Sequence, residues 1–134
     1  MIIINGGSRC NGAYFAKHLI NPDKNETVKV AELRGLAAKN IGQAFYEMKA
    51  VASGTRCKDF FYHANINPEK DETLTPEQWE QAVDELEKRL GLEGQARFVV
   101  EHQKKGRIHR HVVWSRIDVD RMRAIRMDYD YAKH

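Results

Sequence analysis

Two strand-like runs follow each other near the end of the chain, at residues 96–103 and 107–118, with only residues 104–106 between them. A link this short joins antiparallel neighbours, because parallel strands need a crossover of a dozen or more residues. The two runs therefore predict a hairpin. This hairpin constrains the whole fold, since the rest of the chain has to pack on a sheet that is at least partly antiparallel.

Upstream of the hairpin, strand-like and helix-like segments alternate. In chain order they are 2–5 (strand), 13–20 (helix), 27–35 (strand), 36–54 (helix), 58–68 (strand) and 75–92 (helix). The last helix has the clearest ends, with Thr75 as its cap, Gln78 completing a capping box and Gly91 just beyond it. The order βαβαβαββ predicts an α+β fold, in which the helices pack largely on one face of a mostly antiparallel sheet.

Length and composition point to one domain over residues 1–134. No apolar run approaches the ~20 residues that a membrane span needs. Cys10 and Cys57 lie far apart and match no disulfide or metal pattern, so reduced thiols in a cytoplasmic protein are expected.

Basic residues are concentrated in the last quarter of the chain. From residue 101 onward there are nine Lys/Arg against five Asp/Glu, while the net charge of the whole chain is only +3. This balance suits a polyanionic partner such as nucleic acid, although a solvated charged face has the same composition. The candidate DNA contacts are Arg9, Lys104, Lys105, Arg107 and Arg116. Arg9 lies in "GGSRCNG", which reads as a flexible turn whose backbone N–H groups could also cradle phosphates.

Three histidines are placed so that the hairpin can bring them together. His109 and His111 are two residues apart and share one face of their strand. If the turn is centred on Lys105 and Gly106, His102 lies directly opposite His109, and His111 is its diagonal neighbour. A three-residue loop without a bulge would instead turn His102 away.

Three neutral imidazoles on one face can hold a divalent metal and leave its other positions open to substrate. The sequence thus predicts a metal site at His102, His109 and His111. His18 and His63 could line the same cavity, but single histidines of this kind more often pack or cap.

The string "EHQKKGRIHRHVVWSRID" resembles the histidine motif of conjugative relaxases, the plasmid mobilisation nucleases. The match rests on the three histidines, on Gly106-Arg107 and on the "VVWSRID" that follows. "KHLINPDKNETVKVAELRG", "KDFFYHANINP" and "LTPEQWEQA" also fit, so the similarity covers nearly the whole chain. Arg110 departs from the pattern, because the class usually has a hydrophobe between the two histidines. A long cation there could cover apolar surface or reach DNA on the far side of the sheet.

The resemblance implies a DNA nicking-and-joining endonuclease in the bacterial cytoplasm. Relaxases cleave one strand at a plasmid transfer origin, and a tyrosine becomes linked to the 5′ phosphate. The implied cofactor is a divalent metal, Mg²⁺ or Mn²⁺, on the three histidines. The implied partners are plasmid DNA, single-stranded at the nick, with accessory relaxosome proteins and a secretion-system coupling protein. No membrane partner is expected. The chain is short for a relaxase, and we expect it to be truncated at its C-terminus.

The nucleophile is the least defined part of the resemblance. Many relaxases carry this tyrosine in the first helix, where the alignment places His18. Tyr14 lies one helical turn earlier on the same face and is the first candidate. Tyr129 and Tyr131 are alternatives, and Tyr62 is a weaker one.

Other functions remain open at this point. They are a non-catalytic module that binds single-stranded nucleic acid, a replication initiator or transposase of the same histidine class, and a metal-dependent hydrolase of another substrate.

Overall fold

A computed structural model of the chain describes residues 2–19, 27–69, 71–104 and 106–127. Seven strands and three helices lie within these ranges. In chain order they are β1 (Ile2–Arg9), α1 (Gly12–Leu19), β2 (Thr27–Arg34), α2 (Ile41–Ala52), β3 (Phe61–Pro68), α3 (Pro76–Leu90), β4 (Arg97–Lys104), β5 (Arg107–Ser115), β6 (Ile117–Asp118) and β7 (Arg123–Ala124).

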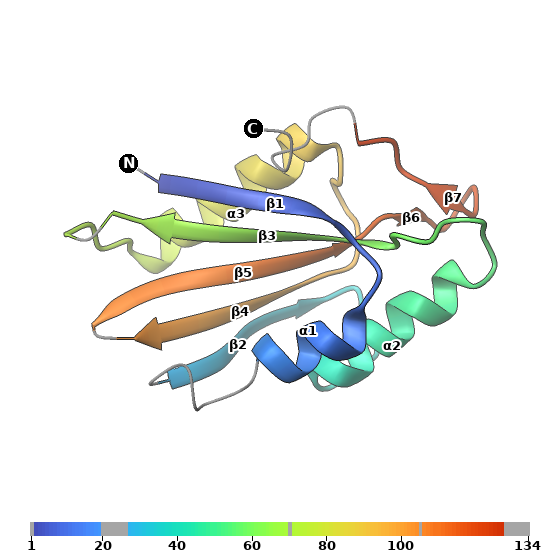
Figure 1. Cartoon of the computed structure of the whole chain (residues 1–134). Coiled ribbons are helices and arrows are strands. Elements are labelled where there is room, and N and C mark those ends of the chain that lie inside the picture. Colours follow the sequence, from blue (N-terminus) through green and yellow to red (C-terminus); the bar gives the residue numbers. More distant parts are fainter. Residues whose placement is uncertain (1, 20–26, 70, 105, 128–134) are drawn as a thin grey trace.

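The five long strands form one sheet in the order β1-β3-β5-β4-β2, and every neighbouring pair is antiparallel (Figure 1). The short strands β6 and β7 pair only with each other. The predicted α+β fold with an antiparallel sheet is therefore confirmed. β5 lies in the middle of the sheet, so its side chains have neighbours on both flanks.

The helices cover both faces of the sheet. α1 and α2 share one face, where the Phe45 ring lies 4.9 Å from the Phe61 ring and 5.0 Å from the Phe98 ring. α3 packs on the opposite face, with its Trp79 and Leu86 side chains in the second core cluster. The expectation of helices largely on one face thus describes α1 and α2, whereas α3 covers the other side. The reason is that the central strands are apolar on both faces in their buried halves, so both faces need cover.

The first strand is longer than predicted. The turn expected over 6–12 is wrong in its first half, because β1 continues to Arg9 and pairs with β3 as far as Phe61. Gly6 makes this possible by its lack of a side chain. A Cβ there would lie 2.7 Å from the Tyr62 hydroxyl oxygen, so a larger residue would push the ring of Tyr62 out of its buried position.

The ends of α3 form as the sequence predicts. The Thr75 side chain accepts a hydrogen bond from the Gln78 backbone N–H, and the Gln78 side chain accepts one from the Thr75 backbone N–H. Gly91 ends the helix at φ 74°, in the left-handed region that glycine adopts at little cost. These caps fix the helix that forms the second layer of the core.

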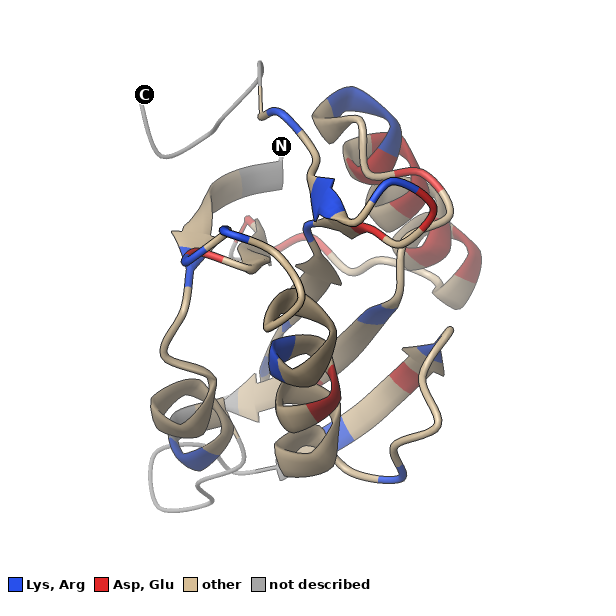
Figure 2. Ribbon diagram, turned by 90° about the vertical axis from the view of Figure 1, so that its right-hand side faces the viewer, with Lys and Arg blue, Asp and Glu red and all other residues tan. Residues whose placement is uncertain are grey.

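The two faces differ in charge. Acidic side chains gather on α3, which carries Glu77, Glu80, Asp84 and Glu85, whereas α1 and α2 show only scattered charges of both signs (Figure 2). The α3 face would repel a polyanion. The face covered by α1 and α2 has no such excess of acidic side chains in the described part of the chain.

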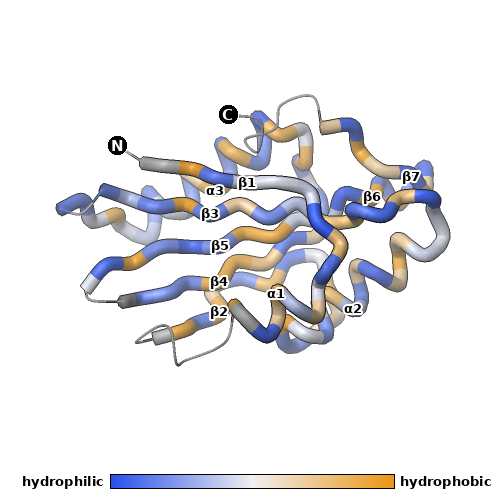
Figure 3. The backbone as a smooth tube through the Cα atoms, in the orientation of Figure 1, coloured by the Kyte–Doolittle hydropathy of each residue, from blue (hydrophilic) through white to orange (hydrophobic). Residues whose placement is uncertain are grey.

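That other face is only partly covered. α1 and α2 lie toward the C-terminal end of β5, where apolar residues predominate, while the N-terminal half of β5 is mostly hydrophilic (Figure 3). Burial along β5 follows the same gradient, from exposed Arg107 to buried Ser115. The polar half of the strand carries two of the three predicted metal ligands.

Candidate metal centre

The hairpin register brings the three predicted ligands to one place. In the β4–β5 pair Lys104 lies opposite Arg107, and His102 lies opposite His109. This is the register predicted for a turn centred on residues 105 and 106. Gly106 has φ 75°, a conformation that a side chain would strain. The main chain thus fixes which face His102 occupies.

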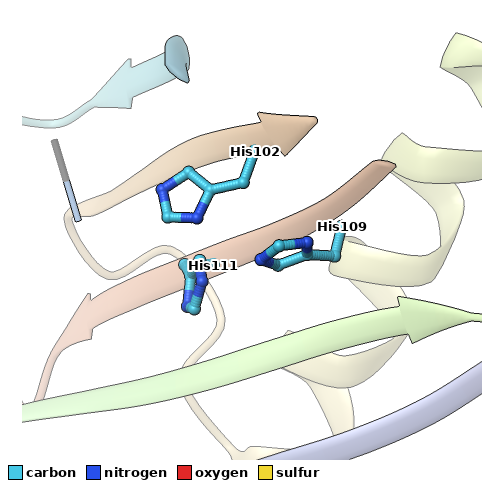
Figure 4. A group of neighbouring side chains, drawn as sticks. All are labelled: His102, His109 and His111. Carbon is cyan, nitrogen blue, oxygen red and sulfur yellow. The ribbon is translucent and has the colours of Figure 1, made fainter. Parts of the chain in front are cut away.

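The three imidazole rings converge on one spot above the sheet (Figure 4). The ring centroid of His102 lies 5.1 Å from that of His109 and 4.6 Å from that of His111, and the two β5 rings are 5.1 Å apart. One nitrogen from each ring lies within 4.8 Å of the others. Three nitrogens this close together could hold one metal ion.

A hydrogen bond to the main chain orients His102. Its Nε2 lies 2.5 Å from the carbonyl oxygen of Leu19, the last residue of α1, and only 4% of the residue is exposed. Since a carbonyl oxygen can only accept, Nε2 is the donor, and the neutral ring keeps its lone pair on Nδ1. Bonds of this kind fix the tautomer and direction of metal-binding histidines.

A fourth histidine joins the group from the neighbouring strand. His63 of β3 lies on the same face, and its Nε2 is 2.8 Å from Nδ1 of His111. The sequence indicated His63 only as a residue that could line the cavity. Its exact place depends on the β3–β5 pairing, which joins strands far apart in the chain. Alternation within "FFYHANIN" could have placed it on the Phe61 face, but not beside His111.

Burial keeps these imidazoles neutral. It is the main cause that lowers the pKa of His111 to about 2 and the pKa of His63 to about 4, with the neighbouring histidines and Arg9 adding to the effect. Burial also lowers the pKa of His102 and the pKa of His109. All four rings are therefore uncharged at pH 7, which is the form that binds metal ions.

The donor set fits a divalent transition metal. Imidazole nitrogens suit first-row ions such as Fe²⁺, Ni²⁺, Cu²⁺ and Zn²⁺, whereas Mg²⁺ and Mn²⁺ favour oxygen ligands and water. Asn65, which lies opposite His111 on β3, has a buried Oδ1 with no hydrogen-bond partner among the described residues. An unsatisfied acceptor beside the histidines is what a site for an ion and its water would leave.

The candidate nucleophiles are placed unequally. Tyr14 is on α1 and is 58% exposed, and its ring lies 5.9 Å from that of Phe15, which in turn lies 4.9 Å from the ring of His63. Tyr14 is thus one aromatic neighbour away from the histidine group. Tyr62 is fully buried on the opposite face, in the α3 core, and is unsuited to attack a substrate. Tyr129, Tyr131 and the side chain of His18 lie outside the described residues.

The predicted DNA contacts also fall into different places. Arg9 is exposed on the histidine face and lies 6.0 Å from the Phe15 ring, and Arg107 is exposed at the start of β5. Arg116 lies past the other end of β5 and donates to the carbonyls of Asp59 and Ile125, which gives it a structural task. The side chain of Lys104 and the whole of Lys105 are outside the described residues. Arg9 and Arg107 are the two that remain close to the cluster.

Two further expectations concern residues away from the cluster. Arg110 lies on the far face, 4.9 Å from the Trp79 ring and 2.9 Å from Glu101 Oε1, so it covers apolar surface there. Cys10 and Cys57 are both free thiols, as predicted. Within the described residues, each helix is too short or too polar to cross a bilayer.

Comparison with known proteins gives one match. The family model described as "Relaxase: MobA/VirD2-like, nuclease domain" matches residues 14–134, which is most of the chain and includes all three predicted ligands. Neither the curated proteins nor the solved structures contain a significant match.

Proposed function

Because the chain belongs to the MobA/VirD2-like relaxase nuclease family, we propose that it nicks one strand of plasmid DNA at a transfer origin and later rejoins it. Membership of this family implies that the chain is an endonuclease that acts on nucleic acid. The strand choice, the covalent intermediate and the metal are the proposed parts. The observation that supports the proposal is that three neutral imidazoles lie close together on the partly open face of the sheet, where they could hold the metal.

His102, His109 and His111 would hold a divalent metal, Mg²⁺ or Mn²⁺. When bound, such an ion neutralises the charge that develops on the phosphoryl oxygens during transfer. The surrounding residues prepare the ligands. The Leu19 carbonyl orients His102, and burial keeps all three ligand rings in the neutral form. The α3 face, with its acidic surface, takes no part.

Tyr14 is the proposed nucleophile, with Tyr129 and Tyr131 as alternatives. Its oxygen would form a bond to phosphorus while the bond from phosphorus to the 3′ oxygen breaks. The phenol loses its proton, the released 3′ oxygen gains one, and the 5′ phosphate stays on the protein. This ester conserves the energy of the broken bond, so a 3′ hydroxyl can later displace the tyrosine and restore the strand.

Exposed cations near the cluster would contact the phosphates of a single strand. Arg9 and Arg107 are the proposed contacts, together with Lys104 and Lys105, which come shortly before Arg107 in the sequence. Accessory relaxosome proteins and a coupling protein are further proposed partners, which the family resemblance supports.

A cleavage-and-joining assay tests this function. A single-stranded oligonucleotide that spans the transfer origin, labelled at its 5′ end, is incubated with the chain and Mn²⁺, and the shortened labelled product is measured. Adding a second strand that has a free 3′ hydroxyl and its own 5′ label should then give a longer labelled product, because that strand displaces the tyrosine and becomes joined to the protein-bound fragment. Cleavage that continues at the same rate in EDTA, or in the His109→Ala variant, would contradict the proposed metal centre. Tight, salt-sensitive binding without any cleavage would favour the non-catalytic module.

A further inference from the structure

His63 contacts the proposed metal centre through His111. It lies opposite Val113 in the β3–β5 pair, while His111 lies opposite Asn65, so the two histidines are diagonal neighbours across the strands. Diagonal neighbours are within reach of aromatic side chains. The two rings are nearly parallel, with an angle of 13° between their planes, and Nε2 of His63 lies 2.8 Å from Nδ1 of His111.

The direction of this hydrogen bond follows from proton counting. A neutral imidazole has one N–H group and one nitrogen with a free lone pair. His111 shares Nδ1 with His63, so Nε2 is the nitrogen that remains for a metal ion. A lone pair on Nε2 requires the proton on Nδ1. His111 is then the donor, Nε2 of His63 is the acceptor, and the proton of His63 is on its own Nδ1.

We propose that His63 is a positioning residue, which accepts the hydrogen bond from His111 and so presents Nε2 of His111 to the metal ion. This role rests on the proposed metal centre. It gives His111 what the Leu19 carbonyl gives His102, namely a fixed acceptor behind the ligand. Partners of this kind set the tautomer and the direction of a ligand ring, and their loss typically weakens metal binding or activity by about 10–100-fold.

Neighbouring contacts hold His63 in place. Its ring lies 4.9 Å from that of Phe15, and Phe15 also lies 5.6 Å from Phe61, the residue two positions earlier on the same face of β3. His63 therefore connects α1, which carries Tyr14, with a metal ligand in the middle of the sheet. It is not a fourth ligand in this arrangement, because the nitrogen that faces the cluster is already bound to His111.

Metal affinity tests the role without a need for DNA. Binding of Mn²⁺ or Co²⁺ to the full chain is measured by calorimetry for His63→Phe, which keeps the ring shape but removes the acceptor, and for His63→Gln, whose amide oxygen can still accept. We expect affinity about 10–100-fold weaker for the first variant and within a few-fold of the original chain for the second. Phe61→Leu is the matched control, because it loosens the same packing without changing the hydrogen bond. It should lower the Tm but leave metal affinity within a few-fold.

The outcomes distinguish the role of His63 from the existence of the metal centre. Equal affinity of the original chain and a folded His63→Phe variant would overturn the role of His63 and leave the metal centre intact. No metal uptake by the original chain would overturn both. If His63→Phe does not fold, ¹⁵N NMR of the histidines in the original metal-free chain decides the question. A proton on Nδ1 of His111 supports the role, and a proton on its Nε2 overturns it.

Discussion

His102 donates a hydrogen bond from Nε2 to the carbonyl oxygen of Leu19 and thereby joins a predicted metal ligand to the last turn of α1. α1 also carries Tyr14, and its Phe15 contacts His63. The helix with the proposed nucleophile is thus tied to the histidine group at two points. These contacts link the helix that carries the proposed nucleophile to the histidines that are proposed as ligands.

Removing His102 should therefore do more than remove a ligand. His102→Ala leaves the Leu19 carbonyl without this donor at a buried position, which costs roughly 1–3 kcal/mol. His109→Ala removes a ligand that is only half-buried. Both variants should bind Mn²⁺ much more weakly than the original chain, but His102→Ala should also unfold at lower urea concentration. Equal urea midpoints for the two variants would show that the bond to Leu19 contributes little.

As the pH is lowered, the metal-free chain should begin to lose stability at a higher pH than protonation of its carboxylates alone would cause. The folded pKa of His63 is lowered to about 4 and that of His111 to about 2, whereas an unfolded histidine titrates near 6.5. Between pH 6.5 and 4 the unfolded chain therefore binds more protons than the folded chain, and the free energy of unfolding falls as the pH falls. Above pH 6.5 this contribution is fully present.

Urea titrations in EDTA at pH 7.5, 6.0 and 5.0 measure this dependence. His63→Gln removes one of the titrating groups, so its free energy of unfolding should fall less steeply over the same range. The same slope in both proteins would show that His63 is not held neutral by the fold.

The network on the far face should be a main source of stability. Glu87 is buried, and its Oε1 accepts hydrogen bonds from Arg97, Arg34 and the Trp114 ring nitrogen. Arg97 is only 3% exposed, so Glu87→Ala leaves a buried cation with less compensation and should cost about 3–5 kcal/mol. Glu85→Ala on the same helix is the control. Its carboxylate is exposed and lies 3.7 Å from Arg89, and such pairs contribute at most about 1 kcal/mol. Thermal unfolding of the two variants compares the costs, and a similar Tm for both would contradict the importance of the network.

The sequence predicts those parts that depend on neighbours in the chain. The His102–His109 pairing follows from a short turn between consecutive strands, and the ends of α3 follow from Thr75, Gln78 and Gly91. Both depend on residues that lie close together in the chain. For this reason the sequence alone could predict that His102, His109 and His111 lie together.

Parts that depend on distant pairings could not be placed in this way. β3 and β5 are neighbours although α3 and β4 lie between them in the chain, so the contact from His63 to His111 has no local signal. The strand character of Gly6 and Gly7 likewise comes from pairing with β3, against the usual preference of glycine for turns. The side on which α3 packs is decided by apolar residues such as Tyr62 and Val112, which lie on neighbouring strands that are far apart in the chain.

The covalent DNA–protein adduct is the most direct test of the central claim, that a metal-dependent tyrosine attack occurs at this site. The chain is incubated with single-stranded transfer-origin DNA and Mn²⁺, run on a denaturing gel, and the linked peptide is identified by mass spectrometry. The account predicts a retarded species that requires Mn²⁺, is lost in His109→Ala and Tyr14→Phe, and carries the nucleotide on Tyr14. An adduct on Tyr129 or Tyr131 would move the nucleophile but keep the reaction. The absence of any adduct from a folded, metal-loaded chain would contradict the account.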